Sequence, residues 1–104
     1  ITLPMTTPRS SEPSFDDSVH EIAAEIADLI IRKQRDYGHG NILTFGEYGV
    51  LVRSSDKIAR LKNLLEGKTA PSNESVDDSW SDLAGYAIIA LMLRRGTFTR
   101  ELKT

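Results

Sequence analysis

The sequence predicts an all-α fold in which three antiparallel helices form a unit that joins a larger helical bundle by oligomerisation. Three segments repeat apolar residues at the spacing of an amphipathic helix. Each segment is bounded by polar capping residues or by glycine, which are the usual signals for helix ends. The third segment is apolar on every side over residues 83–93, which favours burial by more helices than one chain of 104 residues supplies.

The first helix is expected over residues 15–37. Ser14 and Asp17 form a capping box in which Asp replaces the usual Glu, and Gly38 is a typical residue for the end of a helix. The helical repeat is carried by Val19, Ile22, Ala23, Ile26, Leu29, Ile30 and Lys33.

The second helix is expected over residues 45–66, with Gly67 at its end. On a helical wheel one stripe is formed by Leu51, Ser55, Ile58, Lys62 and Leu65. The stripe is centred near Ser55, Ile58 and Lys62, so Lys62 points where a core residue is expected. The flexible stem of a lysine also allows it to pass the core and reach water, which is the more ordinary interpretation of Lys62.

The third helix is expected over residues 74–95. Ser72 or Asn73 is a suitable N-cap, acidic residues occupy the first turn, and Arg94 and Arg95 lie at the end where cations suit the helix dipole. Because two partner helices cannot cover a helix that is apolar all round, we expect a second subunit in a homodimer or higher homo-oligomer to cover the rest.

The expected organisation is one helical domain, residues 15–96, between two tails. Residues 1–14 hold three of the four prolines with many Ser and Thr, which predicts a disordered N-terminal tail. Residues 97–104 are expected to form a C-terminal tail.

Composition narrows the functional classes. A net charge of −2 argues against a protein dedicated to duplex DNA. The chain has no cysteine, which excludes disulfides and thiolate metal sites and favours a cytoplasmic location. No apolar run approaches the roughly 18–20 residues of a membrane span, and the first residues lack the apolar core of a signal peptide.

Residues 32–41, RKQRDYGHGN, place several charged groups next to Tyr37 and two glycines. This stretch has two interpretations. It can be the end of a helix with Tyr37 packed into the core, or it can be a mobile lid over a charged, flat ligand such as a nucleotide, with Asp36 and Asn41 as polar edges.

Asp82 is the sharpest polar signal, because it lies next to a fully apolar segment and a buried carboxylate needs a cation. Lys57, Arg60, Lys62 or a divalent metal could supply the positive charge. Asp78 shares a helix face with Asp82, but it also suits the first turn of its helix. Asp56 has Arg53 three residues before it and Arg60 four residues after it, so an exposed ion-pair network is its ordinary interpretation.

Three motifs in order resemble the phage-associated family called nucleotide modification associated domain 1, over about residues 20–95. They are Lys33-x-x-Asp36-Tyr37-Gly38, then Ser55-Asp56-Lys57-Ile58-x-Arg60-Leu61-x-Asn63-Leu64, then Asp78-x-x-x-Asp82-Leu83-x-x-Tyr86-Ala87-Ile88. The chain is more distantly similar to the MazG-like all-α nucleoside triphosphate pyrophosphatases, which hold Mg²⁺ with acidic pairs on two helices. Arg53 and Ser79 stand where two of those four acids would be.

The resemblance implies a nucleotide-processing enzyme in the cytoplasm of an infected host cell. Asp56, Asp78 and Asp82 would then be the catalytic acids and would hold Mg²⁺, which would neutralise phosphate charge and activate water. The nucleotide-binding residues would be Lys33, Asp36, Tyr37, Lys57, Arg60 and Lys62.

Two alternatives use the same residues. The first is a non-catalytic module that sequesters a nucleotide, which the depleted acid set favours. The second is a structural or interaction bundle in which the polar groups are ion pairs. A purely structural bundle should have no pocket that contains both Asp82 and Tyr37, so this pair discriminates between the hypotheses.

Overall fold

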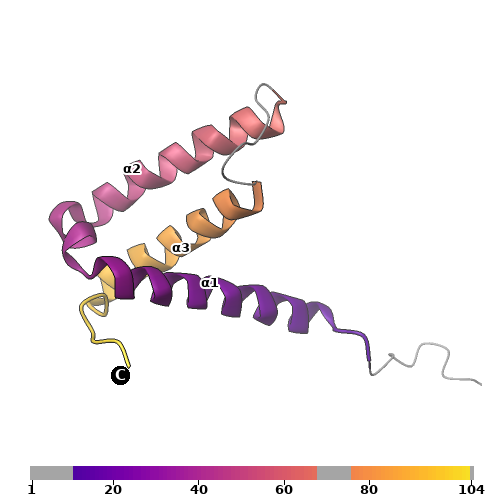
Figure 1. Cartoon of the computed structure of the whole chain (residues 1–104), viewed down its shortest axis with the longest axis horizontal. Helices are drawn as coiled ribbons and strands as arrows, with labels where there is room; N and C mark the ends of the chain where they lie inside the picture. The colour runs from indigo at the N-terminus through magenta and orange to yellow at the C-terminus, as the bar shows by residue number, and fades with distance from the viewer. Residues whose placement is uncertain (1–10, 68–75, 104) are drawn as a thin grey trace, which may run out of the picture.

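The computed structural model describes residues 11–67 and 76–103, and it contains three α-helices and no strand within those ranges. The helices are α1 (Phe15–Tyr37), α2 (Gly40–Leu65) and α3 (Val76–Arg95). The predicted all-α class is therefore confirmed. In Figure 1, α3 lies between the other two helices, and α2 runs in the direction opposite to α1 and α3.

Helix α1 has the bounds that its capping signals predict. The Ser14 side chain accepts a hydrogen bond from the Asp17 amide, and the Asp17 carboxylate accepts one from the Ser14 amide, both at 3.0 Å. At the other end Gly38 has a φ of 71°, and its amide donates to the Gln34 carbonyl at 2.8 Å. The remainder of the predicted N-terminal tail, residues 1–10, lies outside the described residues.

Helix α2 begins five residues earlier than expected. The turn-forming composition around Gly38 and Gly40 suggested a loop, but a first helical stretch forms there and bends at Gly46. Gly46 has φ 63° and ψ −151°, a conformation that is essentially restricted to glycine because a Cβ atom would crowd the adjoining peptide groups. Gly40, by contrast, is an ordinary first residue of the helix and has no positive φ. Gly38 and Gly46, which both have a positive φ, therefore set the direction of the chain between α1 and the long part of α2.

The buried face of α2 differs from the expected one. The residues turned toward α3 are Val50 and Leu61, each 3% exposed, whereas Leu51 and Ile58 of the predicted stripe are 61% and 56% exposed. Helix α2 therefore has two neighbouring rows of apolar side chains. Helix α3 covers the row that contains Val50 and Leu61, and it leaves exposed the predicted row that contains Leu51 and Ile58. The expectation that Lys62 takes a core position is wrong for the single chain, because Lys62 is exposed.

Helix α3 starts at Val76, and the predicted capping residues 72–73 lie outside the described residues. It ends at Arg95 as predicted, and the following Gly96 has a φ of 70°. The segment after it turns back, so that Phe98 is buried and its ring meets the ring of His39 edge-on, with 5.5 Å between centroids. The first residues of the predicted C-terminal tail thus close one end of the fold.

The core is small. Four apolar residues are buried in the described part of the chain, and they are Ile26, Val50, Leu61 and Phe98. Ser79, at the start of α3, is fully buried with them. Within the described ranges, no helix combines the length and the apolarity that a membrane span requires.

Replacement of Gly46 by alanine should destabilise the protein by about 1–3 kcal/mol, because the new Cβ would occupy a conformation that only glycine adopts without strain. Gly40→Ala is the matched control and should be neutral or stabilising by up to about 1 kcal/mol, since alanine is the better helix former. Urea unfolding of both variants measures the difference. Equal effects at the two positions would show that the bend does not depend on the left-handed conformation of Gly46.

Candidate functional site

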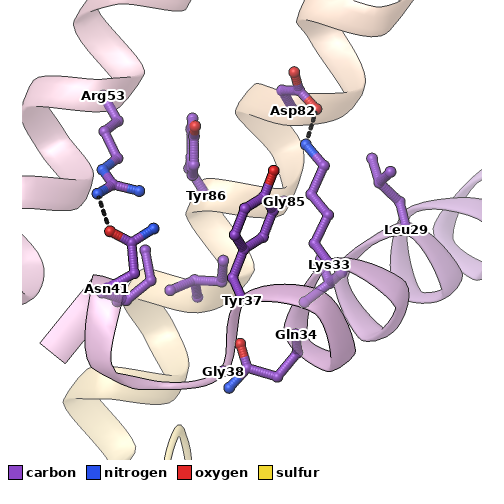
Figure 2. A pocket seen from close by; sticks show the side chains of 13 residues that line it. Leu29, Lys33, Gln34, Tyr37, Gly38, Asn41, Arg53, Asp82, Gly85 and Tyr86 are labelled. Carbon is purple, nitrogen blue, oxygen red and sulfur yellow. Dashed lines mark hydrogen bonds and ion pairs between the residues drawn. The ribbon is translucent and has the colours of Figure 1, made fainter.

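One pocket of about 310 Å³ lies where the end of α1, the start of α2 and the middle of α3 meet. Figure 2 shows Lys33 and Arg53 entering it from two sides, with Tyr37 standing between them. Its polar lining consists of Lys33, Gln34, Tyr37, Asn41, Arg53, Asp82 and Tyr86. Its apolar lining consists of Leu29, Ile30, Ile42 and Ile89. The stretch 32–41 therefore forms one wall of a pocket.

Asp82 is held by two lysines from two different helices. Lys33 of α1 approaches one carboxylate oxygen at 3.0 Å, and Lys57 of α2 approaches the other at 2.9 Å. The side chains of Asp82 and Lys57 are 13% and 19% exposed, while Lys33 is 50% exposed. Lys57 was one of the expected partners of Asp82. Lys33 was not, and it reaches Asp82 because side chains of an α-helix lean toward its N-terminus and α1 runs alongside α3 in the same direction.

These contacts set the protonation of Asp82. Partial burial acts to raise the pKa of its carboxyl group, but hydrogen bonds from Lys57 and Lys33 and the attraction of both positive charges outweigh burial. The pKa of Asp82 is therefore lowered from its ordinary value of 3.8, and the carboxylate stays charged at neutral pH.

Tyr37 is not packed into the core, because 69% of its surface is exposed. Gly38 ends α1 directly after it and leaves the ring at the edge of the pocket. Tyr86, four residues after Asp82 on α3, is half-buried and lines the same pocket. Gly85, next to Tyr86 in the chain, is buried, and a Cβ at this position would meet the Ile30 side chain at 3.4 Å, so α1 lies directly against α3 here.

Two further contacts hold the chain around the pocket. Arg53 donates to the side-chain oxygen of Asn41 at 2.9 Å, which ties the long part of α2 to its first turn across the bend. Gln34 donates from its amide to Nδ1 of His39, and His39 in turn contacts the buried Phe98. Phe98, which follows α3, thus packs against His39 and helps to fix the position of the pocket residue Gln34.

A comparison with known protein families gives a match to nucleotide modification associated domain 1 over residues 33–93, which is more than half of the chain. The chain belongs to this family. No curated protein and no solved structure matched it. The matched region begins at Lys33 and includes both Lys57 and Asp82, so the ion pairs that join the three helices lie within the part shared with the family.

The other residues expected to line a site in this family member are more scattered. Asp36 is exposed and borders a shallow depression on the outside of Tyr37, beside Arg32 and Arg35. Arg60 is half-buried on α2, and Lys62 is exposed. Of the six residues expected to bind a nucleotide, Lys33 and Tyr37 line the pocket, and Lys57 reaches it through Asp82.

The three acids expected to hold a metal are not brought together. Asp56 is exposed on α2, and Asp78 is exposed in the first turn of α3, where it borders a different hollow next to Glu25. Within residues 11–67 and 76–103, no three metal-binding side chains gather in a suitable cluster. Asp82 is the acid of this set that lines the pocket between the three helices, and two lysines pair with it.

Sequence reasoning treated Arg53 as an ion-pair partner of Asp56 and gave no site role to Gln34 or Tyr86. A pattern that could have revealed them is the spacing of four residues, which places two side chains on one helix face. Each helix directs such a pair toward Asp82 and its surroundings. The pairs are Lys33 with Tyr37, Arg53 with Lys57, and Asp82 with Tyr86.

Asp82→Asn tests the role of this carboxylate in stability. A lowered pKa means that its contribution to folding is fully present above pH 3.8 and is lost as the pH falls through the lower value of the folded state. The variant should therefore be about 1–2 kcal/mol less stable than the parent at pH 7, and this difference should shrink as the pH is lowered below about 4.

Urea unfolding between pH 7 and pH 3 measures this difference. Asp36→Asn, the same chemical change at an exposed position, is the control and should leave the stability at pH 7 within about 0.5 kcal/mol of the parent. A difference between parent and Asp82→Asn that stays constant with pH would contradict the assignment.

Proposed function

We propose that this protein binds a nucleotide in the pocket between Lys33, Arg53 and Asp82, and that it does so without hydrolysing it. The observation that carries the proposal is the presence of Tyr37 and Asp82 in one pocket. A purely structural bundle gives no reason for an exposed aromatic ring and several cations to surround the same hollow. The description of the family, which refers to nucleotide modification, supports the same ligand class.

The phosphate would bind at the positive side of the pocket. Lys33, Lys57 and Arg53 carry three positive charges around the single negative charge of Asp82, so the net local charge suits a phosphate dianion. Lysine binds phosphate as a point charge, and the half-exposed ammonium group of Lys33 is the more accessible of the two. Asp82 would hold the lysines in place before the ligand arrives.

The base would lie against Tyr37. An exposed tyrosine ring offers a flat surface on which any base can stack, and such stacking typically contributes about 1–3 kcal/mol. The side-chain amides of Gln34 and Asn41 line the same pocket and can hydrogen-bond to the edge of a base or to a sugar hydroxyl. A volume of about 310 Å³ is at the lower end of the range for small-molecule sites, which suits one nucleotide rather than two.

The proposed site binds a nucleotide without the metal-dependent hydrolysis of the pyrophosphatases. That chemistry needs several carboxylates to hold Mg²⁺ near the phosphates, and the described residues of one chain do not gather them. The donor set around Asp82 is cationic, so it fits a phosphate better than a metal ion. Any Mg²⁺ at this site would enter with the nucleotide as its counterion.

A thermal-shift screen of nucleoside mono-, di- and triphosphates, each with and without Mg²⁺, tests this proposal. A ligand present at 100 times its Kd should stabilise the protein by about 2.7 kcal/mol, because it binds only the folded state. Chromatography of the same mixtures should recover the nucleotide unchanged. Turnover that requires Mg²⁺ and is lost in Asp82→Asn would favour the enzyme, and no shift with any nucleotide would overturn nucleotide binding.

Two substitutions locate the site once a ligand shows a shift. Lys33→Gln and Tyr37→Ala should each weaken binding by about tenfold or more, since they remove a phosphate contact and the stacking surface. Arg94→Gln is the control, because it makes the same change of charge at an exposed pair with Glu47 outside the pocket. Isothermal titration measures the three affinities. An equal loss in all three variants would point to general electrostatic attraction instead of a defined site.

A further inference from the structure

Helices α2 and α3 share an apolar face on the side away from α1. We call it the outer face and define it by Tyr48, Leu51, Ile58 and Leu65 of α2 with Trp80 and Leu91 of α3. These six side chains are between 49% and 74% exposed. Leu51, Ile58 and Leu65 repeat every seven residues, so they form one ridge along α2.

Side chains of both α2 and α3 form the outer face. A groove of about 450 Å³ runs between them, and it is lined by Tyr48 and Leu51 from α2 and by Leu83 and Ala87 from α3. Ala87 is about 160° around the helix from Gly85, which contacts Ile30 of α1. The outer face therefore points away from α1, and α1 cannot cover it.

The size of the face is unusual for a protein that stays monomeric. Its six defining side chains are large and each is about half to three-quarters exposed, so together they present several hundred Å² per chain, at or above the roughly 300–600 Å² of the largest apolar patch on a typical monomer. A standard stable interface buries about 800 Å² per partner. Tyr and Trp, which are enriched in the centres of interfaces, both occur on it.

We propose that the outer face is a dimer interface, and that its partner is the same face of a second copy of this chain. The face carries both a ridge, at Leu51, Ile58 and Leu65, and the adjacent groove, at Leu83 and Ala87. Each copy can therefore place its ridge against the groove of the other, which is the self-complementary pattern of a twofold dimer. Two antiparallel pairs of helices stacked in this way form a four-helix bundle.

This inference does not depend on nucleotide binding, although the two sites share one residue. Tyr86 lines the groove on one side of α3 and the pocket on the other. A second copy in the groove would contact Tyr86 on the side that faces away from the pocket. The dimer is tested by its mass and by the environment of a side chain on the face, neither of which needs a ligand.

Sedimentation equilibrium of the full chain, over a range from 1 to 100 µM, tests the proposal directly. The parent protein should be a dimer, and Leu51→Glu should weaken association by roughly 100-fold, because it places an unpaired charge in an apolar interface. Ile22→Glu on α1 is the matched control, since Ile22 and Leu51 are both 61% exposed, and it should leave the dimer intact. Leu91→Glu, on α3, should repeat the effect of Leu51→Glu.

Trp80 gives an independent signal, because it is the only tryptophan of the chain and lies on the outer face. Its fluorescence should move to longer wavelength when the parent protein is diluted, and should already be there in Leu51→Glu at unchanged helical content by circular dichroism. A monomer at every concentration overturns the proposal. So does a dimer that Ile22→Glu dissociates while Leu51→Glu and Leu91→Glu do not, which would place the contact on α1.

Discussion

The carboxylate of Asp82 is the point at which all three helices meet, because Lys33 reaches it from α1 and Lys57 reaches it from α2. In a fold with so few buried apolar residues, this contact does much to specify how the helices lie against one another. The carboxylate and the lysines stabilise one another, since a partly buried charge without a partner of opposite sign would destabilise the fold. The arrangement of the pocket follows from this small network.

The same network gives the pocket its chemical character. Asp82 holds the ammonium groups of Lys33 and Lys57 close together before any ligand is present. The repulsion between these two positive charges is therefore already offset within the folded protein. A phosphate that enters would share these ammonium groups with Asp82 instead of having to order them. Arg53, anchored through Asn41, adds a third cation whose position depends on the bend of α2. If the pocket binds an anion as proposed, its affinity and the stability of the fold would both depend on Asp82.

The small core also explains the large apolar surfaces. One chain covers the last part of α1, one row of α2 and one side of α3, and it leaves the outer face uncovered. A second copy on that face would supply the burial that a short chain cannot provide alone. The proposed dimer and the proposed pocket lie on opposite sides of α3, so association would leave the nucleotide site open.

The helices and most of their ends follow from the sequence alone. Capping and glycine signals act over three or four residues, so the Ser14 and Asp17 box and the glycines after α1 and α3 could be recognised without knowledge of the fold. The family resemblance also rested on short motifs, and it is confirmed over residues 33–93. The early start of α2 was missed because the glycines at 38 and 40 have the composition of a loop, and no local signal shows that a helix resumes at Gly40 and bends at Gly46.

What only the tertiary structure decided depends on contacts between distant residues. Lys33 and Asp82 are 49 residues apart, and their pairing requires the parallel course of α1 and α3. Local periodicity could not choose between the two apolar rows of α2, because which row is buried depends on where α3 packs. Local periodicity likewise could not show whether Asp56, Asp78 and Asp82 would lie together, because the distance from Asp56 to the other two depends on how α2 packs on α3. A sequence fixes which residues share a helix face, but the packing of one helix on another decides which faces meet.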